Sequence, residues 1–313
     1  MLDSTLAILG VIGGFTLSVL ASRKAVDNTA ELAAGTNIPP FVVGFTLLAL
    51  GTDLPEIANS IVSSLAGHGD LNVGDSVGSA ATQATLVLGL LPFVGGAAIM
   101  LSKTRVLRIG IATVFALLLG AGLMLDGEIS RIDAMIFIAA WAIATAFTWG
   151  PPPEGTQMEL SLEATEKLKK TLVVLLALAV VGGATLLAVW GLTTLAEAIN
   201  VPEFIVAFFL ASLGTSLPEL VVATTAMRRH QTELAVGDAL GATLIDSTLS
   251  IGIGPLIAPI VVTTSLVVPG SILTAGAVGI VALVLSIRGN HDWRSGVAFV
   301  LIYPALYLVL LNI

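Results

Sequence analysis

Residues 38–96 read IPPFVVGFTLLALGTDLPEIANSIVSSLAGHGDLNVGDSVGSAATQATLVLGLLPFVGG, and residues 201–259 read VPEFIVAFFLASLGTSLPELVVATTAMRRHQTELAVGDALGATLIDSTLSIGIGPLIAP. The two stretches align without a gap. Both contain Gly-Thr-x-Leu-Pro-Glu, and both then contain Val-Gly-Asp-x-x-Gly at the same separation. Chance similarity between apolar segments does not readily place two such motifs twice, so the alignment indicates an internal duplication.

The rest of the chain is equally apolar. Of its 313 residues, 56% are hydrophobic and only 11% are charged, and the mean hydropathy is +1.01. Soluble globular chains carry about a quarter charged residues, so this composition excludes a soluble enzyme and a disordered protein. The net charge of −8 leaves no basic surface for nucleic acid. Without Cys, disulfides, zinc–thiolate sites and a Cys nucleophile are excluded.

The apolar stretches predict an all-α membrane protein with ten transmembrane helices, since a spanning helix needs about 20 mostly apolar residues. Buried helices of a large soluble core are the alternative, but the polar runs between the stretches are too short to cover one. The predicted spans are 5–22, 38–66, 73–100, 106–125, 131–149, 170–197, 201–227, 234–259, 266–287 and 294–312.

The basic residues support this count. All of the 13 Lys and Arg residues except Arg131 fall in alternate loops, on one side of the predicted membrane. By the positive-inside rule that side is the cytoplasm, so both termini are predicted outside. The start Met1-Leu2-Asp3 lacks the positive region of a cleaved signal peptide.

The spans divide into two halves of five. Residues 1–149 form the first repeat, 150–169 a cytoplasmic linker and 170–313 the second repeat. Because five is odd, the second copy enters the membrane from the opposite side and is inverted. Inverted repeats are typical of secondary transporters, whose substrate site lies at the repeat interface near mid-membrane.

Each repeated motif carries a proline and a carboxylate inside a span. Pro55 and Pro218 loosen the carbonyls four residues back and their neighbours, and in hydrocarbon these oxygens need partners. Glu56 and Glu219 follow directly. A charge there costs about 3 kcal/mol or more and normally marks a pathway or pairing site. A structural role for two protonated carboxyls is the alternative, but no Lys or Arg lies at similar depth, so a cation is the natural counterion.

A second polar stripe follows in the next span of each repeat. Asp75, Ser79 and Gln83 lie on one helix face, and the corresponding positions are Asp238, Ala242 and Asp246. Asp75 and Asp238 lie near helix starts, where a cap and a vestibule role are equally supported. All of these candidate ligands would bind through oxygen, which suits hard ions such as Ca²⁺, Mg²⁺, Mn²⁺ and Na⁺.

With these motifs the sequence resembles the cation/calcium antiporter superfamily, most closely its prokaryotic sodium/calcium exchangers. The resemblance covers nearly the whole chain, without the large cytoplasmic regulatory loop of eukaryotic members. It implies that Glu56 and Glu219 bind both Ca²⁺ and Na⁺, and that spans 1 and 6 slide to switch access. The further ligands implied are Thr52, Thr215 and the carbonyls of Ala49 and Ser212 for Na⁺, Ser79 and Ser216 for one outer Na⁺ site, and Gln83 and Asp246 beside the central site.

Three positions depart from that pattern. Asp53 and Ala242 stand where the family usually has small hydroxyl residues, and Gln83 stands where Asn is common. The central region is thus predicted to gather Glu56, Glu219, Asp246 and Asp53. Four carboxylates cannot all ionise cheaply without cations, which puts the usual exchange of three Na⁺ for one Ca²⁺ in doubt.

We therefore predict a secondary-active antiporter that exchanges Na⁺ for Ca²⁺ in a prokaryotic cell membrane. The alternative is H⁺-coupled exchange of Ca²⁺, or of Mg²⁺ or Mn²⁺, on the same fold. A membrane-embedded enzyme is disfavoured because no nucleophile–base pair accompanies the carboxylates, and a passive channel would differ by the absence of coupled counterflow. The predicted partners are Ca²⁺, Na⁺ or H⁺ and membrane lipid, with no cofactor and no nucleic acid.

Overall fold

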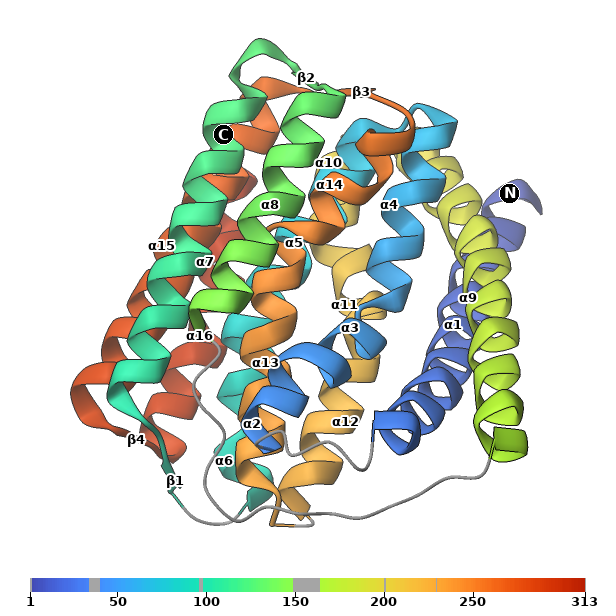
Figure 1. The fold of residues 1–313 in the computed structure, drawn as a ribbon. Helices are drawn as coiled ribbons and strands as arrows, with labels where there is room; N and C mark the ends of the chain where they lie inside the picture. The colour runs from blue at the N-terminus through green and yellow to red at the C-terminus, as the bar shows by residue number, and fades with distance from the viewer. Residues whose placement is uncertain are drawn as a thin grey trace.

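The computed structural model describes residues 2–33, 40–95, 98–148, 164–199, 201–228 and 230–312. Most of its long helices run lengthwise through one bundle, and α1 and α9 are inclined to α7 and α15 (Figure 1). The first half contains α1 (Leu2–Ala33), α2 (Pro40–Val43), η1 (Gly44–Leu48), α3 (Ala49–Thr52), α4 (Leu54–Ala66), α5 (Gly69–Thr82), η2 (Gln83–Val87), α6 (Leu88–Gly95), α7 (Lys103–Leu123), η3 (Met124–Asp126) and α8 (Arg131–Thr148). The second half contains α9 (Ala164–Ile199), α10 (Glu203–Val206), η4 (Ala207–Ala211), α11 (Ser212–Thr215), α12 (Leu217–Arg228), α13 (Thr232–Asp246), α14 (Leu249–Ile257), α15 (Thr264–Arg288) and α16 (Trp293–Leu310).

Eight of the described helical stretches are long and apolar enough to cross a membrane. The stretch 40–66, which is interrupted at Asp53, is outside this set, and the apolar part of α1, Thr5–Ser18, is short. The count of ten spans therefore stays a prediction. The eight stretches are Gly69–Gly95, Lys103–Asp126, Arg131–Thr148, Leu168–Leu192, Glu203–Arg228, Thr232–Ile257, Thr264–Arg288 and Trp293–Leu310.

Several predicted boundaries need correction. Ile99 and Met100, expected to end a helix, form strand β1 instead. The predicted span 234–259 is interrupted at Thr248, whose φ of −141° and ψ of −81° end α13 before α14 begins. Residues 150–163 of the predicted linker lie outside the described residues, and 164–169 already belong to α9.

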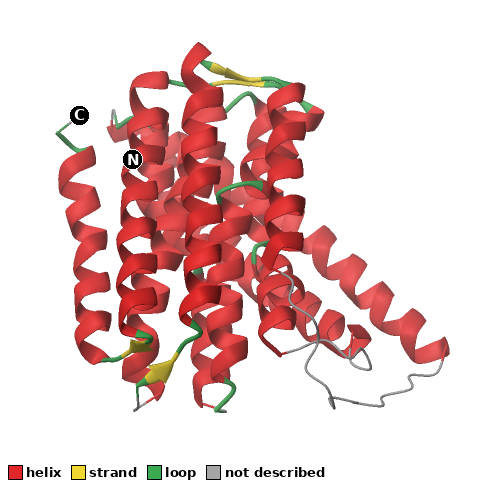
Figure 2. Cartoon of the chain, turned by 60° about the vertical axis from the view of Figure 1, so that its left-hand side comes forward, coloured by secondary structure: helices red, strands yellow, loops and turns green. Residues whose placement is uncertain are grey.

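Two short antiparallel strand pairs join the halves at opposite ends of the bundle (Figure 1). At one end β1 (Ile99–Met100) pairs with β4 (Asn290–His291). At the other end β2 (Glu128–Ile129) pairs with β3 (Ile260–Val261). In each pair a loop of the first half meets a loop of the second. The first and last described residues lie toward one end of the bundle, that of β2 and β3 (Figures 1 and 2).

The central helix of each half packs against the other half. α5 packs on α10 and η4, and α13 packs on α2 and η1. A Cβ on Gly78 would overlap the carbonyl of Phe208, and a Cβ on Gly241 would overlap the carbonyl of Phe45. Only glycine permits this approach of backbone to backbone. The contacts are reciprocal, since each half packs its central helix on the corresponding segment of the other half.

The long helices α1 and α9 pack against each other at one side of the bundle (Figure 1). Glycines again set the distance, since a Cβ on Gly14 would lie 2.7 Å from the carbonyl of Ala184, and one on Gly191 would lie 2.5 Å from that of Ala7. These helices correspond to predicted spans 1 and 6. The central helices α5 and α13 stay enclosed between the halves, and almost all of their residues are buried.

Candidate functional site

Two helices break at matching positions of the duplicated segments. Asp53 separates α3 from α4 with ψ of 7°, and Ser216 separates α11 from α12 with ψ of 4°. Pro55 and Pro218 stand in the first turn after each break. Because proline lacks an N–H, neither continues the hydrogen bonding of the preceding helix. Each break is preceded by a π-helical turn, η1 or η4, a feature that is frequent at functional sites.

The backbone at each break keeps part of its helical hydrogen bonding. The amide of Asp53 donates to the carbonyl of Ala49 at 2.9 Å, and the amide of Ser216 donates to that of Ser212 at 3.0 Å. The side-chain hydroxyl of Thr52 also lies 3.1 Å from the Ala49 carbonyl oxygen. A carbonyl oxygen has two lone pairs, and one at each of Ala49 and Ser212 is left for a cation when the threonine proton goes to Asp238 or Asp75 instead. Both carbonyls stay proposed as cation ligands.

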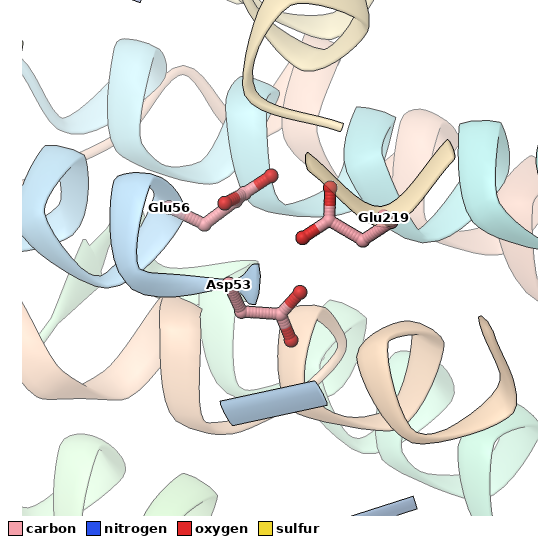
Figure 3. Close-up of side chains that lie close together, drawn as sticks. All are labelled: Asp53, Glu56 and Glu219. Atoms are coloured by element: carbon pink, nitrogen blue, oxygen red, sulfur yellow. The ribbon is translucent and has the colours of Figure 1, made fainter. Parts of the chain in front are cut away.

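Three carboxylates meet where the broken helices approach each other. Asp53, Glu56 and Glu219 each place an oxygen within 4.8 Å of the others, and all three side chains are fully buried. Figure 3 shows the carboxyl groups turned toward one another, two from the first half and one from the second. Glu56 and Glu219 stand in the first turns of α4 and α12, where the helix N-terminus favours negative charge.

This cluster has few partners within the protein. Both oxygens of Asp53 and Glu219, and Oε2 of Glu56, have no hydrogen-bond partner. No Lys or Arg side chain is buried among the described residues. Unit charges 4 Å apart interact by about 4 kcal/mol at an effective dielectric constant near 20. The cluster therefore needs cations or protons to balance it.

Hydroxyl groups of both halves border the cluster. Oγ of Ser79 lies 3.5 Å from Oε1 of Glu56 and 3.2 Å from Oγ1 of Thr215. Ser216 stands at the second break with its hydroxyl buried and unpartnered. The structure thus brings the two hydroxyl residues predicted for an outer Na⁺ site to the site region. Thr52 and Thr215, one in each half, are also buried.

Two further carboxylates were missing from the predicted site. Asp75 and Asp238 are fully buried and contact the threonine of the opposite half. Oγ1 of Thr215 donates to Oδ1 of Asp75 at 3.0 Å, and Oγ1 of Thr52 lies 3.4 Å from Oδ1 of Asp238. Their recurrence in Val-Gly-Asp-x-x-Gly was the signal that could have identified them. Neither of the two roles considered for these aspartates, a helix cap or a vestibule, predicts hydrogen bonds to the threonines of the opposite half.

The bond to Asp75 determines how Thr215 can act. A hydroxyl has one proton and two lone pairs. When Thr215 gives its proton to Asp75, its lone pairs are left for Ser79 or for a cation. Asp75 is therefore a positioning residue for a predicted ion ligand, and carboxylates that orient ligands in this way raise the affinity of metal sites.

The remaining predicted residues, Asp246 and Gln83, and the neighbouring Ala242 differ in what they offer to the carboxylate cluster. Asp246 ends α13 and is bonded to Ser250, with Oδ1 3.4 Å from Oγ, but it is not one of the three carboxylates in the close cluster. Asp246 is nevertheless buried and near enough to interact electrostatically with Asp53, Glu56 and Glu219, so the gathering of all four carboxylates stays a prediction. Gln83 begins the π-helical turn η2, and both ends of its buried amide lack a partner. Ala242 packs with Ala49 in a buried apolar group and offers no oxygen.

This arrangement can bind dehydrated cations. Ca²⁺ takes about six to eight oxygen ligands in adaptable geometry. The cluster offers carboxylates, and Ser79 of α5 and Thr215 of α11 add hydroxyls at its border. Unpartnered buried acceptors are rare in folded proteins and call for a bound ion or water. Half-helix termini that meet mid-bundle are also a feature of ion sites in transporters.

The fold is that of an integral membrane protein, with a buried anionic centre between two halves that pack their central helices on each other. The family model "Sodium/calcium exchanger protein" matches residues 6–150 and 169–312. The chain belongs to this sodium/calcium exchanger family, within the cation/calcium exchanger superfamily, and the resemblance seen in the sequence is confirmed.

Individual proteins agree with this assignment. The Inner membrane protein YrbG of Escherichia coli (strain K12) is 30% identical over 266 residues, which cover 81% of each chain. The structure of the sodium-calcium exchanger NCX_Mj soaked with Na⁺ and Sr²⁺ has a TM-score of 0.67 at 23% identity, covering 97% of this chain and 98% of that one. The H⁺/Ca²⁺ exchanger CAX has a TM-score of 0.76 at 21% identity, covering 98% and 82%.

Proposed function

We propose that the protein is a secondary-active antiporter of a prokaryotic cell membrane that exchanges Na⁺ for Ca²⁺ by alternating access. In this proposal residues 1–149 and 170–313 are the inverted repeats, joined by a cytoplasmic linker, and both termini lie outside. The ions bind between the repeats, at Glu56, Glu219 and their neighbours. The inward Na⁺ gradient drives Ca²⁺ out of the cell.

The carboxylate cluster is the observation that carries this proposal. Asp53, Glu56 and Glu219 are buried with no basic counter-charge among the described residues. Glu56 belongs to the first half and Glu219 to the second, so a cation bound by both holds the halves together. Na⁺ and Ca²⁺ compete for the same oxygens, and this competition couples their fluxes. The α1–α9 pair slides across the remainder to switch access in this proposal.

A proton-coupled exchange of Ca²⁺ is the second candidate, and Asp53 is the observation that favours it. With Asp53 the cluster has three carboxylates, whereas one Ca²⁺ balances only two negative charges. The third charge needs a monovalent cation or a proton beside Ca²⁺. The H⁺/Ca²⁺ exchanger CAX shares the fold, so the scaffold is compatible with either coupling.

Calcium uptake into proteoliposomes distinguishes these functions. The purified protein is reconstituted, and uptake of radioactive Ca²⁺ is measured with an outward Na⁺ gradient, an outward H⁺ gradient or no gradient. We expect uptake at least about tenfold above protein-free vesicles with the Na⁺ gradient alone. Uptake driven only by H⁺ would replace Na⁺ by H⁺ in the proposal. Absence of Ca²⁺ uptake under all gradients would contradict Ca²⁺ as the cargo and direct the assay to Mg²⁺ and Mn²⁺.

Restoring two hydroxyl groups tests the coupling ion. Asp53→Ser with Ala242→Ser removes one charge from the cluster and adds an oxygen beside Ala49. We expect Ca²⁺ uptake to become more strongly dependent on Na⁺, by about tenfold in the ratio of Na⁺-driven to H⁺-driven rates, which is the lower end of the effect of one altered ligand shell. The measurement is the same flux assay at fixed protein density. An unchanged ratio would argue against Asp53 as the residue that tunes coupling.

A further inference from the structure

A small enclosed cavity lies beside the site, where the α1–α9 pair meets the central helices. Its polar lining consists of Ser18, Asn59, Asp75 and Thr215, and Phe15 and Leu192 are among its apolar walls. It has room for roughly one water-sized particle. None of its lining residues belongs to the close carboxylate cluster.

The amide of Asn59 is held in one orientation. Its Nδ2 donates to Oδ2 of Asp75 at 2.6 Å, and a carboxylate oxygen cannot be the partner of the amide oxygen. Oδ1 of Asn59 is consequently left without a donor, although the residue is only 4% exposed. Oγ of Ser18, 2% exposed, is likewise unpartnered. Two oriented buried acceptors therefore line the same small space as a carboxylate.

The charge of this group matches a monovalent cation. Asp75 supplies one negative charge, while Asn59, Ser18 and Thr215 supply neutral oxygens. A divalent ion would leave a net positive charge in a buried, partly apolar space, which is costly. No Lys or Arg is buried among the described residues, so nothing basic competes for Asp75.

The second half has no equivalent of this arrangement. Asp238 corresponds to Asp75, but Val222 stands where Asn59 stands in the first half. A valine cannot donate to a carboxylate, and Oδ2 of Asp238 has no hydrogen-bond partner. The amide of Asn59 therefore occurs in the first half alone. The motif Val-Gly-Asp-x-x-Gly, which contains Asp75, occurs in both halves.

A continuous row of oxygens leads from the cavity to the cluster. Asp75 contacts Thr215 at 3.0 Å, Thr215 contacts Ser79 at 3.2 Å, and Ser79 lies 3.5 Å from Glu56. We propose that Ser18, Asn59 and Asp75 form a separate sodium-binding station that exchanges its ion with the carboxylate cluster through Thr215. Sliding of α1 and α9, whose side chains wall the cavity, opens the station. The inference deepens the proposed Na⁺ coupling and rests on it.

Equilibrium binding of ²²Na⁺ to the purified full-length protein, without Ca²⁺, tests the station. In Glu56→Gln with Glu219→Gln the cluster is disabled, and we expect about one Na⁺ per chain to remain bound at the station. Adding Asn59→Val, the residue of the other half, or Ser18→Ala is expected to weaken that binding by at least about tenfold. The matched control is Thr274→Val, which removes a buried unpartnered hydroxyl outside the cavity lining and should leave it unchanged.

Two results would overturn the station. One is no Na⁺ bound in the Glu56→Gln, Glu219→Gln protein, which would mean that the cavity holds only water. The other is equal Na⁺ binding in the Asn59→Val, Ser18→Ala and Thr274→Val forms, each checked for folding by melting temperature and gel filtration. The transport assay decides the proposed function separately. Na⁺ bound by a protein that moves Ca²⁺ only with H⁺ would preserve the station and refute the Na⁺ coupling.

Discussion

Glu219→Gln is expected to abolish cation exchange. The substitution keeps the size of the side chain but removes a charge from the centre where two broken helices meet. Even residues that only orient a metal ligand typically change affinity by 10- to 100-fold, so loss of a direct carboxylate ligand should lower Ca²⁺ flux by at least about 100-fold. Glu56→Gln is expected to behave in the same way, because Glu56 occupies the same position in the other half. Proteoliposome Ca²⁺ uptake measures both.

Glu233→Gln is the matched control for this prediction. Glu233 lies in the first turn of α13 and is exposed, so the same chemical change there should leave the flux near that of the unmodified protein. Folding of each variant is compared by gel filtration and melting temperature. A well-folded Glu219→Gln form with normal Ca²⁺ exchange would remove Glu219 from the ion site.

Gly241→Ala is expected to disrupt the contact between the halves. Its new methyl group would overlap the carbonyl of Phe45, and in Gly78→Ala the methyl group would overlap that of Phe208. Backbone cannot move aside as the end of a flexible side chain can. Overpacking of this kind costs about 1–3 kcal/mol or more. We expect a clear fall in melting temperature and in the yield of monodisperse protein for either substitution.

Gly276→Ala supplies the comparison. Gly276 lies within α15, and a Cβ there would meet nothing within 4 Å. Alanine favours a helix over glycine by up to about 1 kcal/mol, so this variant should be as stable as the unmodified protein or more so. Equal melting temperatures for Gly241→Ala and Gly276→Ala would contradict the close approach of α13 to η1.

The two halves differ at a few positions of the proposed site. Threonine, glutamate and the Asp75 position recur in both halves, whereas Asp53 corresponds to Ser216 and Gln83 to Asp246. Each half thus adds one unmatched carboxylate at a different place. Asp53 joins the close cluster and Asp246 does not. The recurrent residues suit binding from either side, and the unmatched ones can set which ions share the cycle.

The structure brings some of the predicted site residues together, and the reason differs from residue to residue. Glu56 and Glu219 could be named because a carboxylate in an apolar span is a local signal. The role of Asn59 could not, because it depends on a contact with Asp75 that only the packing of α4 on α5 creates. The break at Thr248 could not be predicted either, because no proline marks it.

Local chemistry along the chain was sufficient for the membrane class, the duplication and the paired motifs. The hydropathy of a span depends on the residues of that span alone, and a proline disturbs the helix that contains it. Both signals can therefore be read without knowing any distant contact. The contacts of Asp75 with Thr215 and of Asp238 with Thr52, and the closeness of Asp53 to Glu219, join residues of opposite halves. These contacts exist because glycines let α5 and α13 approach the other half, and such distances between remote segments are decided only when the whole bundle packs.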